Sequence, residues 1–346
     1  MPLEIRGFDP HTASEAAFAA LNAFGNRARA EHYPEDPPHT PEERARMWRA
    51  LPPYIERHAW TAHPSNAPTV AALGAVYVPR TEDNQHLAWF EIHVIPEWRG
   101  QGLARLLLAR IAATAQAQAR RLLLADTDAD IPAGEAFMRR IGARPGLVVR
   151  ANQLELAELD RARLRRWQER APRDVFTLGL WVGPYPEAEL EAIARMKAVM
   201  NTAPRDDLEI EDHHVTVEEL RQEEAALQRR GVVRWTLYAR ERGTGEIAGY
   251  TEVFWDPLHP ETLHQGDTGV FPRYRNRGLG RWLKAAMLER ILAEHPEVRR
   301  VRTGNANSNA PMLKINYALG FKPRKTWTEW QVALARVLEY LAAPSS

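Results

Sequence analysis

The sequence predicts two tandem α/β domains, because a strand–turn–helix segment occurs in it twice. Residues 92–111 read IHVIPEWRGQGLARLLLARI and residues 268–287 read TGVFPRYRNRGLGRWLKAAM, and they align without a gap at an offset of 176. Each copy is an apolar run, a Pro, an Arg, a short Gly-containing turn and a helix-like stretch. The chain of 346 residues is also too long for one typical core and suits two domains of about 170 residues.

The turn in each copy is suited to binding an anion. Gly102 and Gly278 lie where a helix should begin, and a residue without a Cβ lets a ligand approach the backbone. The first N–H groups of a helix have no internal partner, and the helix dipole adds positive charge there, so a phosphate is stabilised. Guanidinium groups that can add charge-assisted contacts to a pyrophosphate flank the turns at Arg99 and Arg105 and at Arg275, Arg277 and Arg281.

The helix after each turn has one apolar face. Its positions are Leu103, Leu106, Leu107 and Ile111 in the first copy and Leu279, Trp282, Leu283 and Met287 in the second. A Rossmann fingerprint needs a small residue where Arg105 and Leu283 stand, and a P-loop needs a Gly-Lys-Ser/Thr that neither turn contains. Both familiar phosphate motifs are therefore excluded.

Both turns match Arg/Gln-x-x-Gly-x-Gly/Ala, and with this motif the chain resembles the GNAT superfamily of acyl-CoA N-acyltransferases in its tandem two-domain type. The resemblance covers nearly the whole chain, and the mycothiol synthase type is one similar tandem relative. It implies that each domain is a mixed, mainly antiparallel sheet flanked by helices. It also implies acetyl-CoA as co-substrate, with the pyrophosphate at the turn and the pantetheine arm along the preceding strand. The expected cofactor-binding residues are Val94, Arg99, Gly100, Gln101, Gly102, Leu103, Ala104, Arg105, Val270, Arg275, Asn276, Arg277, Gly278, Leu279, Gly280, Arg281, Asn309 and Asn316.

Composition narrows the function classes. The 46 basic and 45 acidic residues nearly cancel, which argues against a nucleic-acid-binding footprint. Without cysteine there is no disulfide, Cys-ligated metal or Cys nucleophile. No apolar signal core or membrane-length run is seen, so we expect a cytoplasmic protein that is a monomer or homodimer. His213-His214 has no further ligands at suitable spacing, so we expect no metal.

The first half reads in order as strand Leu3–Phe8, a helix over 14–30, and a capped helix that starts at Thr40-Pro41-Glu42-Glu43. Strands follow at 70–78 and 88–95, then the first turn and helix. The remaining elements are a strand at 121–125, a helix over 133–141 that ends at Gly142, and a strand at 146–156.

The charged stretch 157–173 is interpreted as a helical linker, or alternatively as a last peripheral helix of the first domain. This gives an N-terminal domain over 1–156, for which a non-catalytic role is one alternative, and a C-terminal domain over 174–346. The second domain opens with strand 176–182 and a helix over 187–201, and Thr216 repeats the cap of Thr40 at the same offset. Strands at 247–254 and 268–271 lead into the second turn.

A carboxylate stands eight residues before each motif Arg, Glu91 before Arg99 and Asp267 before Arg275. In the family this strand often carries an acidic residue that takes the amine proton. The resemblance therefore implies Asp267, and less strongly Glu91, as the general base. The other interpretation is that each carboxylate caps a strand or pairs with an Arg.

The ends of the two repeats differ. In the second half, the resemblance implies an Asn that opens a helix at Asn309 and a Tyr that protonates the thiolate. Counting back from Gly320 places the Tyr position at Asn316, with Tyr317 one residue and about 100° of helix further on. Tyr317, Asn316 through a water, or neither residue is then the acid. In the first half Met138 and Ile131 occupy the two positions, so the second domain is the better candidate for catalysis.

The sequence therefore predicts an acetyl-CoA-dependent N-acetyltransferase that acts on a primary amine of a small molecule or peptide by direct transfer. The alternative is a non-catalytic acetyl-CoA-binding regulatory or scaffolding protein. Acceptor pockets of the family are built from variable loops, here at 32–50 and 201–217, and the acidic run 206–212 is a further candidate for acceptor binding. No residue identifies the acceptor.

Overall fold

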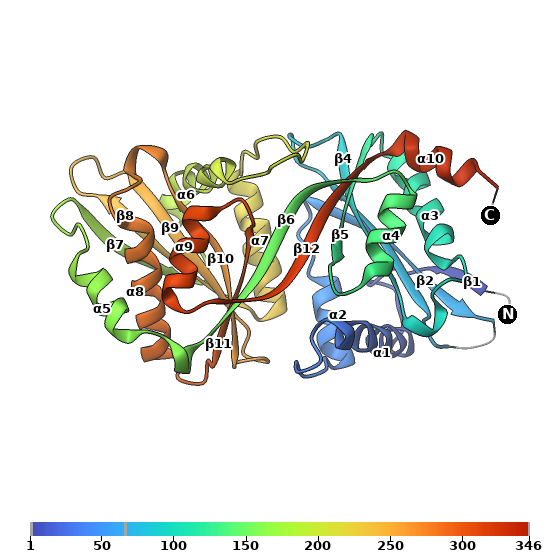
Figure 1. Cartoon of the computed structure of the whole chain (residues 1–346), viewed down its shortest axis with the longest axis horizontal. Coiled ribbons are helices and arrows are strands. Elements are labelled where there is room, and N and C mark those ends of the chain that lie inside the picture. Colours follow the sequence, from blue (N-terminus) through green and yellow to red (C-terminus); the bar gives the residue numbers. More distant parts are fainter. Residues whose placement is uncertain (1–2, 66–67, 345–346) are drawn as a thin grey trace. The chain divides into compact units, whose positions relative to one another are not determined.

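The computed structural model describes residues 3–65 and 68–344, which form two compact units. The first unit consists of the described residues within Met1–Leu147, Asp207–Ile210 and Trp327–Ser346. The second consists of Val148–Asp206 and Glu211–Thr326. Each unit is a mixed sheet with helices on both faces (Figure 1), as predicted for each domain.

The first unit has a sheet in the order β1-β2-β3-β4-β5-β12, in which only the β4–β5 pair is parallel. Helices α3, α4 and α10 cover one face through a core around Leu108, Ile111 and Met138. Helices α1 and α2 cover the other through Phe18, Leu21 and Trp48. The elements are β1 (Leu3–Gly7), α1 (Glu15–His32), α2 (Pro41–Arg49), β2 (Ile55–Pro64), β3 (Ala72–Pro79), β4 (Leu87–Val94), α3 (Leu103–Ala117), β5 (Leu122–Asp128), α4 (Pro132–Arg140), β12 (Lys322–Ala333) and α10 (Leu334–Ala342).

The second unit has the order β6-β11-β10-β9-β8-β7, in which only the β10–β11 pair is parallel. Helices α5, α8 and α9 lie on one face, and α6 and α7 lie on the other. The elements are β6 (Arg144–Glu155), α5 (Arg161–Glu169), β7 (Phe176–Val182), α6 (Leu190–Lys197), α7 (Val217–Arg230), β8 (Val233–Glu241), β9 (Ile247–Trp255), β10 (Thr262–Val270), α8 (Leu279–Glu294), β11 (Arg300–Ala306) and α9 (Ala310–Leu319). The division between the units cuts two strands, so that residues 144–147 of β6 belong to the first unit and residues 322–326 of β12 to the second.

The last strand of each sequence repeat belongs to the sheet formed by the other repeat. Strand β6 (green in Figure 1) follows the first repeat but pairs with β11, from Arg300–Glu155 to Ala306–Val149. Strand β12 (red) follows the second repeat but pairs with β5, from Trp327–Asp128 to Ala333–Leu122. The compact units therefore differ from the expected domains at 1–156 and 174–346. Each exchanged strand covers an edge that would otherwise carry unpaired backbone groups.

The stretch expected as a linker, 157–173, contains α5, which packs within the second unit. Leu164 is buried in the core against α8. Arg163 donates a hydrogen bond from Nη1 to the carbonyl of Ala318 at 2.7 Å. This segment is therefore an integral helix of the second unit in the structure.

Part of the acidic run 206–212 lies in the first unit. Leu208 is buried with Leu122 and Leu124 of β5. Gln331 of β12 is fully buried and accepts a hydrogen bond from the Glu209 amide at 2.9 Å. The middle of this run is thus anchored by packing on the sheet of the first unit.

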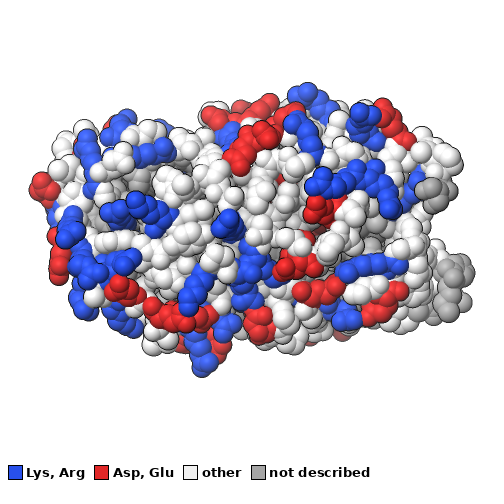
Figure 2. Space-filling view, viewed as in Figure 1, with Lys and Arg blue, Asp and Glu red and all other residues white. Residues whose placement is uncertain are grey.

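Charge is mixed over the molecular surface. Positive and negative side chains are interspersed on the face drawn in Figure 2, in keeping with the net charge of +1. Among the described residues, no helix is both long enough and apolar enough to span a membrane.

Candidate active site

The two predicted anion turns have the same backbone geometry. Gly102 and Gly278 precede α3 and α8 in the left-handed region, with φ of 81° and 83°. A Cβ added at either glycine would meet no atom within 4 Å. Neither helix start has a side-chain cap. The first amides of both helices are therefore accessible to an anion such as a pyrophosphate.

The motif arginines brace each turn against the strand before it. Arg99 Nε donates to the Val94 carbonyl at 3.0 Å, and Arg275 Nε donates to the Val270 carbonyl at 2.9 Å. Arg99 Nη2 donates to Glu31 Oε2 at 2.7 Å, whereas Arg275 Nη2 donates to the Thr202 hydroxyl. In the structure these guanidinium groups fix the shape of the turn, a role that the sequence did not suggest.

The other arginines at the turns differ between the units. Arg105 donates to the carbonyls of Leu341 and Ala343 and lies 5.0 Å from the Tyr340 ring centre, so the end of α10 engages it. Arg277 and Arg281 are exposed beside aromatic rings. The arginines of the second turn are thus more exposed to an anion in solution than Arg105 of the first. Among the other expected cofactor residues at the turns and helix starts, Gly100, Gln101, Ala104, Asn276 and Gly280 are not buried. Leu103 and Leu279 are buried, so only their backbones are available.

The parallel strands separate just before each turn. The β4–β5 pairing covers Leu87–Trp89, although β4 continues to Val94. The β10–β11 pairing covers Thr262–His264, although β10 continues to Val270 and β11 to Ala306. Backbone groups on these last stretches can pair with an extended ligand. Glu91 and Asp267 both lie on them.

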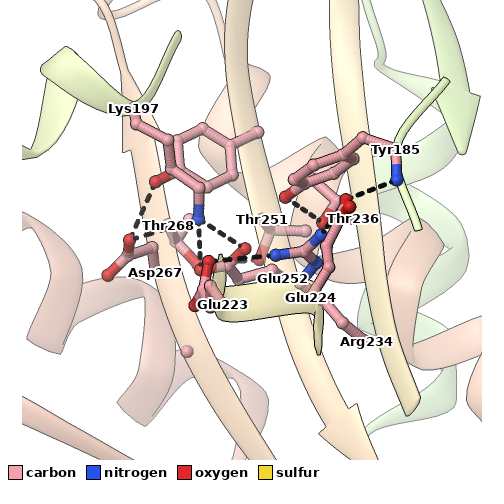
Figure 3. A network of polar contacts seen from close by, with 12 residues as sticks. Tyr185, Lys197, Glu223, Glu224, Arg234, Thr236, Thr251, Glu252, Asp267 and Thr268 are labelled. Carbon is pink, nitrogen blue, oxygen red and sulfur yellow. Dashed lines mark hydrogen bonds and ion pairs between the residues drawn. The ribbon is translucent and has the colours of Figure 1, made fainter. Parts of the chain in front are cut away.

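Asp267 is an accessible carboxylate held by neighbours of the second unit. It accepts a hydrogen bond from the Tyr250 hydroxyl at 2.8 Å and lies 3.8 Å from Lys197 Nζ (Figure 3). Its side chain is 38% exposed. The β9–β10 register shifts between Gln265 and Thr268, so Asp267 lies at an irregularity of the strand. Burial and the neighbouring Asp267 raise the pKa of Tyr250, which keeps the phenol protonated as a donor.

A buried charge network supports Asp267. Lys197 of α6 donates to both oxygens of Glu252 at 2.8 and 2.7 Å, and both side chains are buried. Burial raises the pKa of Glu252. Burial alone would lower the pKa of Lys197, but Glu252, Tyr185, Asp267 and Glu223 together raise it. Beyond this pair, Arg234 contacts Glu223 and Glu224 at 3.1 Å each (Figure 3). Sequence reasoning missed this network. The available signal was Glu252, a charge in the middle of an apolar strand.

Glu91 has a similar partner in the first unit. It accepts a hydrogen bond from the Tyr77 hydroxyl at 2.6 Å and lies 3.3 Å from His93 Nε2. Burial opposes protonation of His93, but the adjacent Glu91 raises the histidine pKa overall. Both units therefore place a tyrosine-bound carboxylate on the separated strand.

Comparison with known proteins bears on the identity of this arrangement. The model of the acetyltransferase (GNAT) family matches residues 25–143 and 197–321, which together exceed half of the chain. The protein belongs to the GNAT family. A comparison with curated proteins found no match.

Solved structures share the fold of this GNAT protein. A tandem GNAT protein from the clavulanic acid biosynthesis pathway is 24% identical with a TM-score of 0.77, and each chain is covered to 100%. A GCN5-related N-acetyltransferase from Sphaerobacter thermophilus is 15% identical, with a TM-score of 0.67 and 96% coverage of each chain. A putative acetyltransferase from Pyrococcus horikoshii is 12% identical with a TM-score of 0.53, covering 96% of this chain and 89% of its own. The tandem GNAT architecture predicted from the repeat is confirmed. The GNAT fold implies acyl-CoA-dependent acetyl transfer.

The residues expected near the thioester lie on α9 in different surroundings. Asn309 caps the helix by accepting from the Met312 amide at 3.3 Å. Asn316 is fully buried between Lys284 and Asn305, at 2.8 and 2.7 Å. Tyr317 is 39% exposed on the adjoining side of the helix. Asn316 and Tyr317 therefore lie in separate environments.

The first unit of this GNAT protein also carries two facing carboxyl groups. Asp126 of β5 stands opposite Glu329 of β12. Burial and the charge of Asp126 raise the pKa of Glu329 to about 7. Because this folded pKa lies above the unfolded value, Glu329 contributes stability below about pH 4.5 that is lost as pH rises through about 7.

We therefore expect Glu329→Gln to raise the melting temperature at pH 8 and to leave it nearly unchanged at pH 4. Thermal unfolding followed by circular dichroism at both pH values measures this. Exposed Glu82→Gln is the matched control and should have no effect at either pH. An equal effect of Glu329→Gln at both pH values would contradict the carboxyl pairing.

Proposed function

We propose that this protein transfers the acetyl group of acetyl-CoA directly to a primary amine of a small molecule or peptide, and that the second unit carries the reaction. The observation that carries the proposal is the placement of Asp267. This carboxylate is accessible, lies on the stretch of β10 that has left β11, and directly precedes an open anion turn. Pyrophosphate bound at the turn would direct the arm of acetyl-CoA toward it.

The proposed reaction has four balanced events. The neutral acceptor amine attacks the thioester carbonyl carbon, Asp267 takes the proton that the amine nitrogen loses, the carbon–sulfur bond breaks, and the thiolate takes a proton from water. Backbone amides near Val270 would polarise the thioester carbonyl. Tyr250 donates a hydrogen bond to Asp267, and Lys197 Nζ lies 3.8 Å from it, so both neighbours hold the carboxylate in place.

Neither candidate acid on α9 is assigned a proton-transfer step in this proposal. The hydrogen bonds of buried Asn316 are directed to Lys284 and Asn305, and Tyr317 faces outward. Water entering between the separated strands is therefore the proposed proton source for the thiolate.

The test is release of free CoA thiol when acetyl-CoA is mixed with a panel of primary amines, including an aminoglycoside, a polyamine, amino acids and a peptide. Amine-dependent thiol release with formation of the N-acetyl product would support the proposal. Tight acetyl-CoA binding without release for any amine would instead indicate a regulatory acetyl-CoA-binding protein. We infer the acceptor loops at 32–50 and 201–217 only from the family resemblance.

Within this proposal, Asp267→Asn should lower kcat about a hundredfold, the lower end of typical effects of a general base. The amide keeps the size of the side chain but cannot take the proton. Acetyl-CoA affinity should stay nearly unchanged, because the turn is intact. Steady-state kinetics and titration calorimetry measure the two quantities.

Glu91→Gln is the matched control for Asp267→Asn, since it makes the same chemical change in the first unit. It should retain kcat within about twofold. If Glu91→Gln were the variant that lost activity, the assignment of catalysis to the second unit would be wrong.

A further inference from the structure

Three polar side chains form a hydrogen-bonded row in the second unit, between α8, α9 and β11. Lys284 Nζ donates to Asn316 Oδ1 at 2.8 Å, and Asn316 Nδ2 donates to Asn305 Oδ1 at 2.7 Å. Lys284 is 2% exposed and Asn316 is 0% exposed. Asn305 is only partly buried. The row therefore leads from a buried amine to a position that solvent or a ligand can reach.

Lysine sets the direction of every hydrogen bond in the row. Lys284 Nζ is the donor, so Asn316 presents its oxygen to Lys284. The amide nitrogen of Asn316 is then directed to Asn305, which must present its own oxygen. The side-chain nitrogen of Asn305 is left as a donor at the accessible end.

This donor lies where the two parallel strands have separated. The last residue of β11 that pairs with β10 is Arg302, and Asn305 is further along the strand. Side chains alternate along a strand, so Asn305 shares a face with Val301, which is buried in the core against α8. The donor thus faces the layer of α8, the helix that begins at the second anion turn.

The fold itself does not require a polar row here. Lys284 corresponds to Leu108 at the repeat offset, and Asn316 corresponds to Met138, four residues before the glycine that ends each helix. Leu108 and Met138 are both buried in the core of the first unit. The second unit therefore has a lysine and an asparagine at positions where the first unit has an apolar pair. The same fold forms with the apolar pair, and burying polar groups is unfavourable.

We propose that Asn305 recognises acyl-CoA by donating a hydrogen bond from its side-chain amide to a carbonyl oxygen of the ligand, and that Lys284 positions it through Asn316. The ligand group is an amide carbonyl of the pantetheine arm or the thioester carbonyl. This inference rests on the proposed function, because it requires acetyl-CoA to lie between β10 and β11. Asn305 is the binding residue, and Lys284 and Asn316 are positioning residues.

The test is titration calorimetry with acetyl-CoA in a Gly102→Glu background, which blocks the first turn. Asn305→Ala should weaken binding about fivefold, as expected for one net hydrogen bond. Lys284→Met keeps the length of the side chain but removes the donor, and should weaken binding by a similar factor. The double variant should bind no more weakly than Asn305→Ala, because both changes break one row.

Two further readouts make the result specific. Leu108→Met in the same background is the matched control and should leave affinity unchanged. Titration with CoA, which lacks the thioester carbonyl, locates the acceptor. Equal losses for CoA and acetyl-CoA indicate a pantetheine amide, and a loss for acetyl-CoA alone indicates the thioester, so either pattern supports recognition by Asn305.

Several outcomes would overturn the inference. Unchanged affinity in Asn305→Ala would exclude the recognition role, and additive losses in the double variant would exclude positioning through Asn316. Failure of the Gly102→Glu parent itself to bind acetyl-CoA would instead refute the assignment of the second unit as the acyl-CoA site, and the inference with it. Thermal melts of each variant confirm that a folded protein was titrated.

Discussion

Replacing Gly278 with glutamate is expected to abolish amine acetylation and to weaken acetyl-CoA binding in the second unit more than a hundredfold. The new carboxylate would stand at the helix start where the pyrophosphate is proposed to bind, so like charges would repel in place of the attraction of the helix dipole. The left-handed backbone at φ 83° also disfavours any side chain, at about 1–2 kcal/mol. Gly102→Glu should lose only the binding that belongs to the first unit. Titration calorimetry and thiol release measure the two effects.

Gly183→Glu is the matched control for this change. Gly183 also has a positive φ, of 72°, and a Cβ there would meet no atom within 4 Å. It follows β7 and belongs to neither motif turn, so it carries the same backbone strain and the same new charge without the ligand site. Activity should survive in this variant. Retention of tight binding in Gly278→Glu would show that the pyrophosphate lies elsewhere.

The sequence predicted the architecture because the geometry of each repeat depends on residues close together in the chain. A glycine at the start of an amphipathic helix, preceded by an apolar strand, defines an open turn wherever it occurs. The same offset placed Glu91 and Asp267 at equivalent positions, and in the structure both lie on strand ends that have separated from their parallel partners. These features depend on local sequence, and local sequence was sufficient to find them.

Strand exchange could not be read from the sequence. Strands β6 and β12 both follow a helix and a glycine, and each mixes apolar and polar residues without a pattern that selects the edge of one sheet over the other. Which edge each strand joins depends on pairing across more than a hundred residues of chain. Strands β2 and β8 were missed for a different reason, since Arg, His and Thr interrupt their apolar runs.

The site was predicted only where the motif determined it. The helical count that separated Asn316 from Tyr317 was informative, because α9 buries the first and exposes the second. The partners Lys197 and Lys284 were not predicted, because lysine in a helix usually indicates a solvated face. Only the packing reveals that both lysine amino groups are buried, one beside a carboxylate and the other beside an amide.

Replacing Lys284 and Asn316 together with leucine and methionine is expected to stabilise the second unit by about 4 kcal/mol at pH 7. Burial lowers the pKa of Lys284 from 10.5 to about 7. Each pKa unit corresponds to about 1.4 kcal/mol, so at pH 7 the folded state loses about 4 kcal/mol relative to a lysine that keeps its usual pKa. Leu108 and Met138 indicate that the apolar pair fits this architecture. Lys284→Leu alone should gain less, because buried Asn316 would lose a hydrogen-bond partner at about 1–3 kcal/mol.

The pH dependence distinguishes this mechanism from simple improvement of packing. Between pH 7 and 10.5 the unfolded chain binds more protons at Lys284 than the folded protein does, so stability of the natural protein should rise with pH in this range. The advantage of the double variant should therefore shrink to about 1–2 kcal/mol at pH 9.5. Denaturant unfolding of the full chain at both pH values measures it. Lys314→Leu, an exposed change on α9, the helix of Asn316, should show no such dependence. A gain that is independent of pH would mean that Lys284 remains charged in the folded state.

If replacing Lys284 both raises stability and weakens acetyl-CoA binding, the lysine serves ligand binding and not packing. A residue retained for packing would lower stability when replaced by a side chain of poorer fit. Lys284 is expected to do the opposite, since its removal relieves the burial of an amine and at the same time leaves Asn305 without a fixed orientation. The first unit, with Leu108 in the same place, already has the more stable alternative. The polar row is therefore best explained by what its accessible amide binds.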